Sequence, residues 1–120
     1  MNTQELFTAI EAALAQVEAQ LTTSVGASSL CTLEKSNGVT HAMKYLEGQQ
    51  QAYRGALRRW HNREDITPLL HYLREEQINN ETMRNGRLGG SPQWQAYLEG
   101  NLAALAQLQA LLNPSTGAES

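Results

Sequence analysis

The feature that most constrains the fold is a seam of large residues through the middle of the chain. Its members recur at alternating intervals of four and three, as they do along one face of a helix. They are Val39, Met43, Leu46, Gln50, Tyr53, Leu57 and Trp60. The spacing predicts a helix that begins near Asn37 and runs to Trp60. Gly48 and Gly55 inside it each cost about 1 kcal/mol relative to alanine, so packing must hold this helix together.

The same spacing predicts three further helices. The first carries Leu6, Ile10, Leu14, Val17 and Leu21 on one face. Asn2 with Glu5 can form a capping box at its start, and Thr3 is a competing N-cap. The next begins at Thr67-Pro68, with Thr67 as N-cap, turns Leu69, Leu70, Leu73, Ile78 and Met83 inward and places Asn79 and Asn80 outward. The last opens at Ser91-Pro92 and buries Trp94, Leu98, Leu102, Leu105, Leu108 and Leu112.

One segment admits a second interpretation. Residues 28–35 can form a short strand, and Asn37-Gly38 is a hairpin turn signal, so a β-hairpin near residues 29–45 competes with the helix that begins near Asn37. The expected fold is therefore mainly α, a bundle of about four helices, with this hairpin as an alternative near residues 29–45. Residues 1–114 form a single helical domain, and residues 115–120 form a disordered tail.

Charge is segregated along the chain. All nine Lys and Arg residues lie between Lys35 and Arg87, and both flanks are acidic, although the net charge is −3. Flanking helices that pack against the central one can neutralise it, or the centre can present a basic face to an acidic partner. A net negative charge makes nucleic acid an unlikely partner.

Three groups of residues are candidate sites of chemistry. His61, Glu64, Asp65 and His71 are metal-type ligands at helical spacing, but they fall in a predicted helix break and lack the Glu-x-x-His order of a di-iron site. The basic and aromatic run from Tyr53 to Arg63 can bind nucleic acid, although a solvated face explains it better. Cys31 lacks a neighbouring base apart from Lys35, which favours a small buried side chain.

No catalytic triad, phosphate loop or catalytic carboxylate pair occurs in the sequence. We therefore expect a non-enzymatic protein with no cofactor and no metal. A run of about 18 apolar residues is absent, and the first 14 residues lack a basic leader region, so we expect no membrane contact and a cytoplasmic location. The long seam beside a leucine-rich last helix, with Tyr97 and Leu111 off the main stripe, predicts a homo-oligomer, most simply a dimer.

Three segments stand out beside the order of the predicted helices. They are the amphipathic start from Gln4 to Leu21, the stretch Leu33-Glu34-Lys35 with Leu46 and Tyr53-Arg54-Gly55-Ala56-Leu57, and Asn79-Asn80 followed by Asn85-Gly86-Arg87-Leu88. The helix order and these segments resemble the FlgN-type flagellar and type III export chaperones of bacteria. The third segment is similar to the family's Asn-x-x-Asn-Gly-x-Leu turn, although Thr82 stands where the family has the first Asn. Gly89-Gly90-Ser91-Pro92 also interrupts a helix that runs on in the family.

This resemblance implies a helical chaperone that binds amphipathic C-terminal helices of export substrates, mainly hook-associated proteins. The alternative is a small phage, immunity or assembly-system module that acts through protein–protein contacts. In either case we expect the partner helix to lie in a groove between the second and last helices. The predicted walls are Tyr53, Leu57 and Trp60 on one side and Trp94, Leu98 and Leu102 on the other, with Arg54, Arg58 and Arg59 as charges at the rim.

Overall fold

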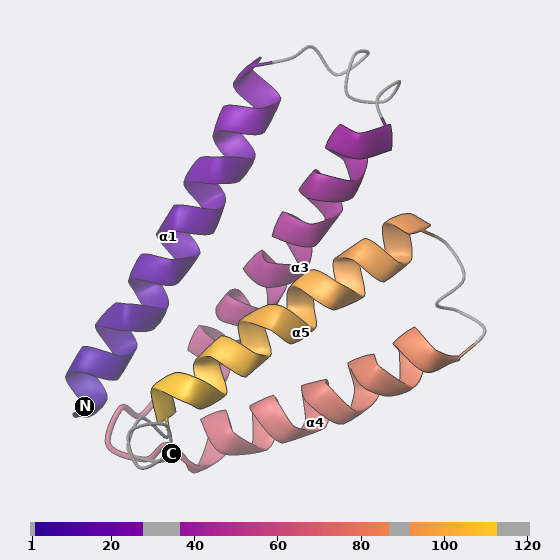
Figure 1. Ribbon diagram of the computed structural model, residues 1–120. Coiled ribbons are helices and arrows are strands. Elements are labelled where there is room, and N and C mark those ends of the chain that lie inside the picture. The colour runs from indigo at the N-terminus through magenta and orange to yellow at the C-terminus, as the bar shows by residue number, and fades with distance from the viewer. Residues whose placement is uncertain (1, 28–36, 87–91, 113–120) are drawn as a thin grey trace.

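Four helices make up the fold in the computed structural model, which describes residues 2–27, 37–86 and 92–112 (Figure 1). They are α1 (Thr3–Ala27), α3 (Asn37–Arg59), α4 (Thr67–Asn85) and α5 (Pro92–Leu112). The predicted helical bundle is confirmed. The hairpin alternative is not supported, because its return arm, residues 39–45, belongs to α3, while residues 29–36 lie outside the described residues.

Local side-chain contacts explain where two of the helices begin. The Asn2 carboxamide oxygen accepts a hydrogen bond from the Glu5 backbone N–H at 2.8 Å, so Asn2 caps α1 as predicted. At the start of α4 the prediction is wrong by one residue. Ile66 is the N-cap, Thr67 is the first helical residue, and the Asp65 carboxylate accepts the Thr67 backbone N–H at 3.1 Å. These hydrogen bonds satisfy donors that have no partner within the helix.

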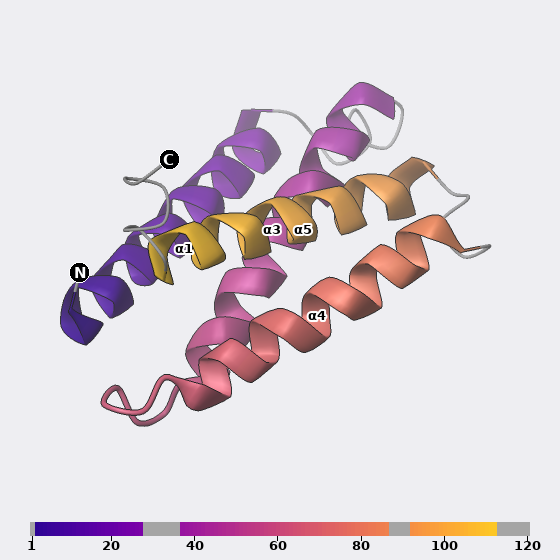
Figure 2. The same cartoon turned by 60° about the horizontal axis from the view of Figure 1, so that its bottom comes forward.

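The helices α3 and α5 cross at the centre of the molecule, where two glycines let their backbones meet (Figure 2). A Cβ atom on Gly48 would overlap the Tyr97 carbonyl of α5. A Cβ atom on Gly100 would overlap the Tyr45 carbonyl of α3. Small residues permit this close approach of two helix backbones. The packing expected to hold the glycine-containing helix together is therefore the α3–α5 crossing.

The remaining two helices pack on this crossed pair from different sides. α1 lies against α3, whereas α4 runs beside α5 and packs more extensively on α5 than on α3 (Figures 1 and 2). The core between them buries large side chains from all four helices. Its largest fully buried members are Trp60, Tyr53, Ile10, Leu69, Leu73, Leu98, Leu105 and Leu108. Of the predicted last-helix stripe, Trp94, Leu102 and Leu112 are only partly buried.

The prediction of which α4 residues are buried is partly wrong. Leu69 and Leu73 lie in the core, but Leu70 is 45% exposed and Ile78 is 58% exposed. Tyr72 and Asn80 are buried instead, although Asn80 was expected to point outward. Both find polar partners on neighbouring helices, which makes the burial of these polar atoms tolerable.

No helix among the described residues is long and apolar enough to cross a membrane.

Candidate functional site

A half-open cavity of about 570 Å³ lies between α3, α4 and α5, and we call it the α3–α4 trough. Each helix lines it with residues three or four positions apart, which is one face per helix. The lining residues are Gln51, Gly55, Arg58 and Arg59 from α3, His61 just after it, Tyr72, Glu76, Asn80 and Met83 from α4, and Trp94, Tyr97 and Asn101 from α5. The trough exists because α4 rests mainly on α5.

Two buried asparagines form the polar part of the trough floor. The Asn80 side-chain amide donates a hydrogen bond to the Asn101 carboxamide oxygen. The Asn101 amide in turn donates to the Gly48 carbonyl at 3.1 Å, beside the glycine crossing. Each residue is 5% exposed. These two hydrogen bonds link α4 to α5 and α5 to α3, and they fix the relative positions of the three helices that line the trough.

Tyr72 forms the wall at the point where α4 meets α3. Its hydroxyl donates to the Ala52 carbonyl at 3.2 Å and lies against Gly55, where a Cβ atom would overlap it. Burial, followed by the nearby Glu76 carboxylate, raises the pKa of the Tyr72 phenol to about 12. The phenol therefore stays protonated near neutral pH and acts as a donor to the α3 backbone.

Charged side chains are concentrated at one end of the trough. Arg58 and Arg59 come from the last turn of α3, and His61 lies two residues beyond the end of this helix. The Arg59 guanidinium lies 5.9 Å from the centroid of the Tyr72 ring, a cation–π arrangement. Within the described part of the chain, the side chains of Arg58 and Arg59 form no ion pair with a carboxylate. This end of the trough thus presents two guanidinium groups that are not neutralised by the fold.

An aromatic wall occupies the other end. The rings of Trp94 and Tyr97 on α5 are stacked, with centroids 5.4 Å apart and an interplanar angle of 5°. Burial, and secondarily the carboxylates of Glu76 and Glu47, raise the pKa of the Tyr97 phenol. Met83 at the end of α4 lines the same region. Large flat rings beside a flexible thioether form a surface suited to apolar side chains of different shapes.

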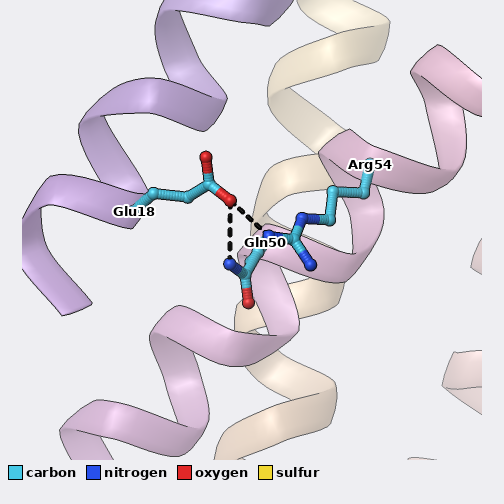
Figure 3. Close-up of polar contacts among 3 residues, drawn as sticks. All are labelled: Glu18, Gln50 and Arg54. Atoms are coloured by element: carbon cyan, nitrogen blue, oxygen red, sulfur yellow. Dashed lines mark hydrogen bonds and ion pairs between the residues drawn. The ribbon is translucent and has the colours of Figure 1, made fainter. Parts of the chain in front are cut away.

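Arg54 does not belong to the trough, because it faces α1 (Figure 3). Its guanidinium pairs with the Glu18 carboxylate, and the Gln50 amide donates to the same carboxylate oxygen at 3.1 Å. The hydrogen bonds from Arg54 and Gln50 lower the pKa of Glu18. The acidic first helix thus neutralises part of the basic central helix here, as one of the two interpretations of the charge pattern expected.

The structure separates the nine residues that were predicted as a partner site. Only Trp94, Arg58 and Arg59 line the trough. Tyr53, Trp60 and Leu98 are buried in the core, so they are not available as walls of an exposed groove. Leu57 and Leu102 are partly buried against the same core, and Arg54 pairs with Glu18.

The α3 residues predicted as a partner site and the α3 residues that line the trough lie on nearly opposite faces of this helix. The predicted stripe on α3, residues 53, 57 and 60, lies two positions from the stripe at 51, 55 and 58 that lines the trough. Two positions are a rotation of about 200° at 3.6 residues per turn, which is almost the opposite face. Sequence reasoning chose the apolar stripe, which is the core. It missed Tyr72, Tyr97, Asn80 and Asn101, whose only signal was their helical spacing.

The other candidate groups are also placed by the structure. Among the residues described, no three His, Cys, Asp or Glu side chains converge as metal ligands, and this includes the group around His61. The aromatic and basic run is divided, since Trp60 packs on Phe7 with centroids 5.7 Å apart and Arg63 covers the Phe7 ring at 3.7 Å. Cys31 lies outside the described residues.

The arrangement in the trough is suited to noncovalent recognition by hydrogen bonds, charge and aromatic contact. Comparison of the chain with protein-family models, with curated proteins and with solved structures found no match.

Proposed function

We propose that this chain is a non-enzymatic helical binding protein that holds an amphipathic helix of a partner protein in the α3–α4 trough. The observation that carries the proposal is the trough itself, a cavity of about 570 Å³ lined by one face from each of three helices. Helix-in-groove recognition uses such a surface, with anchors inserted at helical spacing.

The dimensions of the trough support a helix as occupant. Along α4 the lining residues run from Tyr72 to Met83, which spans about 16 Å at about 1.5 Å per residue. That length corresponds to about three helical turns. A helix with its side chains is about 10–12 Å wide, so a whole helix of this length is larger than the cavity of about 570 Å³. The cavity therefore admits the side chains of one face and leaves the other face in water. An amphipathic segment meets both requirements.

The finer proposal follows the resemblance to FlgN-type chaperones. In that case the partner helix is the amphipathic C-terminal segment of an exported protein, and the chain acts in the cytoplasm of a bacterium before export. The second candidate, a phage, immunity or assembly-system module, uses the same trough for a helix of a toxin or a virion protein. The identity of a co-purified partner distinguishes the two candidates.

The test uses a displayed library of short amphipathic helical peptides, selected on the full chain. The blocking variant is Gln51→Trp, because Gln51 is exposed on α3 and lines the trough, so an indole there fills the cavity without disturbing the core. The matched control is Gln16→Trp on the exposed part of α1. We expect selected peptides to bind the native chain and the control, and to lose binding to Gln51→Trp. Equal binding to both variants contradicts the proposal.

A further inference from the structure

We infer that the partner helix carries an acidic residue that Arg58 and Arg59 clamp at the end of the trough nearest the connection between α3 and α4. The inference rests on the proposed function and names the chemistry of its ligand. Three features of the described residues support it: the position of the cations, their lack of partners within the fold, and the separate position of Glu76.

The topology gathers the two guanidinium groups at one end. α3 ends at Arg59 and α4 begins at Thr67, so Arg58 and Arg59 stand where these two helices join. Met83 and Trp94 stand at the opposite end, where α4 finishes and α5 starts. The two ends of the trough therefore differ, with positive charge at one end and the apolar rings at the other.

Arg58 and Arg59 differ from Lys44 and Arg54 of α3 in having no carboxylate partner in residues 2–27, 37–86 and 92–112. Lys44 pairs with Glu47 at 3.1 Å, and Arg54 pairs with Glu18. The Arg59 guanidinium is held over the Tyr72 ring, which orients it without neutralising it. A guanidinium presents a planar fork of donors that matches a carboxylate in two parallel hydrogen bonds. A ligand carboxylate completes this end of the trough.

Glu76 makes the fit directional. It lines the trough from α4, one helical turn beyond Tyr72 in the direction of Met83, and its carboxylate is close enough to Tyr97 to raise the pKa of that phenol. A carboxylate placed at the centre of the trough meets this like charge, whereas one placed beside Arg58 does not. The preferred partner helix therefore places its acidic residue at the end of the trough nearest the connection between α3 and α4. It places a basic or hydrogen-bond-donating side chain opposite Glu76 and an apolar side chain beside Trp94.

The probes are the best-binding library peptide, its Glu→Gln and Glu→Lys forms, and succinate and inorganic phosphate alone. The protein variants are Arg58→Glu and, as a matched charge reversal outside the trough, Arg74→Glu on the exposed face of α4. Binding is measured by titration calorimetry at two salt concentrations. Circular dichroism checks that each variant is folded; Arg58 is exposed and forms no ion pair among the described residues, so its reversal leaves the core unchanged.

We expect Arg58→Glu to lower the affinity for the acidic peptide by about tenfold or more, which is the effect of losing a charge-assisted hydrogen bond. We expect the Glu→Lys form of the peptide to recover binding to this variant. Arg74→Glu should change affinity far less. Equal losses with Arg58→Glu and Arg74→Glu overturn the inference. So does succinate or phosphate that binds as tightly as the peptide, or a dimer of the chain that Arg58→Glu dissociates.

The two proposals fail in different ways. Selected peptides that Gln51→Trp excludes, but that contain no acidic residue or ignore Arg58→Glu, overturn the clamp and leave the helix-binding function in place. A library that yields no peptide bound in the trough contradicts the proposed function and the clamp together.

Discussion

Asn80 of α4 donates a hydrogen bond to Asn101 of α5 in a buried position where both side chains are 5% exposed. Asn101 also donates to the Gly48 carbonyl of α3 at 3.1 Å. One residue therefore connects all three helices that line the trough. Loss of either asparagine leaves a buried polar group without its partner, which costs more than the hydrogen bond itself contributes.

We predict that Asn101→Ala and Asn80→Ala each lower the free energy of unfolding by about 1–3 kcal/mol. Asn101→Ala leaves the Asn80 amide without its acceptor, and Asn80→Ala leaves the Asn101 carboxamide oxygen without its donor. The double variant should cost less than the sum, since it removes both members of the pair. Urea titration measures all three values. Asn79→Ala, an exposed neighbour on α4, is the control and should change stability by less than about 0.5 kcal/mol. Strict additivity would argue against this coupling.

The close contact of α3 and α5 at Gly48 and Gly100 predicts that alanine at these positions destabilises the fold, although alanine normally stabilises a helix relative to glycine. Alanine is favoured over glycine in a helix by about 1 kcal/mol, so Gly48→Ala and Gly100→Ala would stabilise an uncrowded helix. Because each new Cβ atom overlaps a backbone carbonyl of the facing helix, we expect both to destabilise the fold by about 1–3 kcal/mol or more. Thermal unfolding measures the effect, and Ala106→Gly at an exposed site of α5 calibrates the propensity alone. Higher stability in both alanine variants would refute the close crossing.

Tyr72 predicts a loss of stability at alkaline pH. The folded chain holds the Tyr72 proton up to about pH 12, whereas an unfolded tyrosine releases it near the ordinary pKa of 10.0. Folding is therefore favoured below about pH 10, and this contribution disappears as the pH rises through about 12. Tyr53 and Tyr97 act in the same direction. In denaturant unfolding between about pH 10 and 12, the free energy of unfolding should fall less steeply with pH for Tyr72→Phe than for the native chain. An equal fall in both proteins would contradict the assignment to Tyr72.

The oligomeric state is a separate prediction. Leu70 and Ile78 of α4 are 45% and 58% exposed, and we place them in the interface of the dimer expected from the sequence. Light scattering of the full chain should report a dimer at high micromolar concentration, and Ile78→Glu should shift it toward the monomer. Glu substitution at the exposed Gln16 of α1 is the control. A monomer for the native chain under these conditions would rule out this prediction.

Helix positions followed from the sequence because large apolar residues recur at helical intervals, and a helix can satisfy that pattern only by burying the stripe. The seam from Val39 to Trp60 became α3, and its members Tyr53 and Trp60 became core. The same rule placed Tyr53, Trp60 and Leu98 on the walls of an accessible groove, whereas the fold buries them in the core. The strongest apolar stripe of a helix is the one that the fold buries, so it is the poorest guide to what stays accessible.

The parts that could not be predicted depend on contacts between distant residues. Gly48 and Gly100 lie more than fifty residues apart, and nothing in either local sequence indicates that the two backbones touch. Asn80 is polar and was expected in water. Its burial depends on Asn101, which supplies the acceptor from another helix. Tyr72 is buried for the same kind of reason, since its hydroxyl reaches the α3 backbone beside Gly55.

Hydrogen exchange of the full chain, with and without the best library peptide, tests most directly whether the α3–α4 trough is the recognition site. The account predicts slower exchange in the segments that line it, residues 51–59 of α3, 72–83 of α4 and 94–101 of α5, with little change along residues 3–22 of α1. Protection on α1, or around Leu70 and Arg74 on the outer face of α4, with the trough segments unchanged, would contradict it.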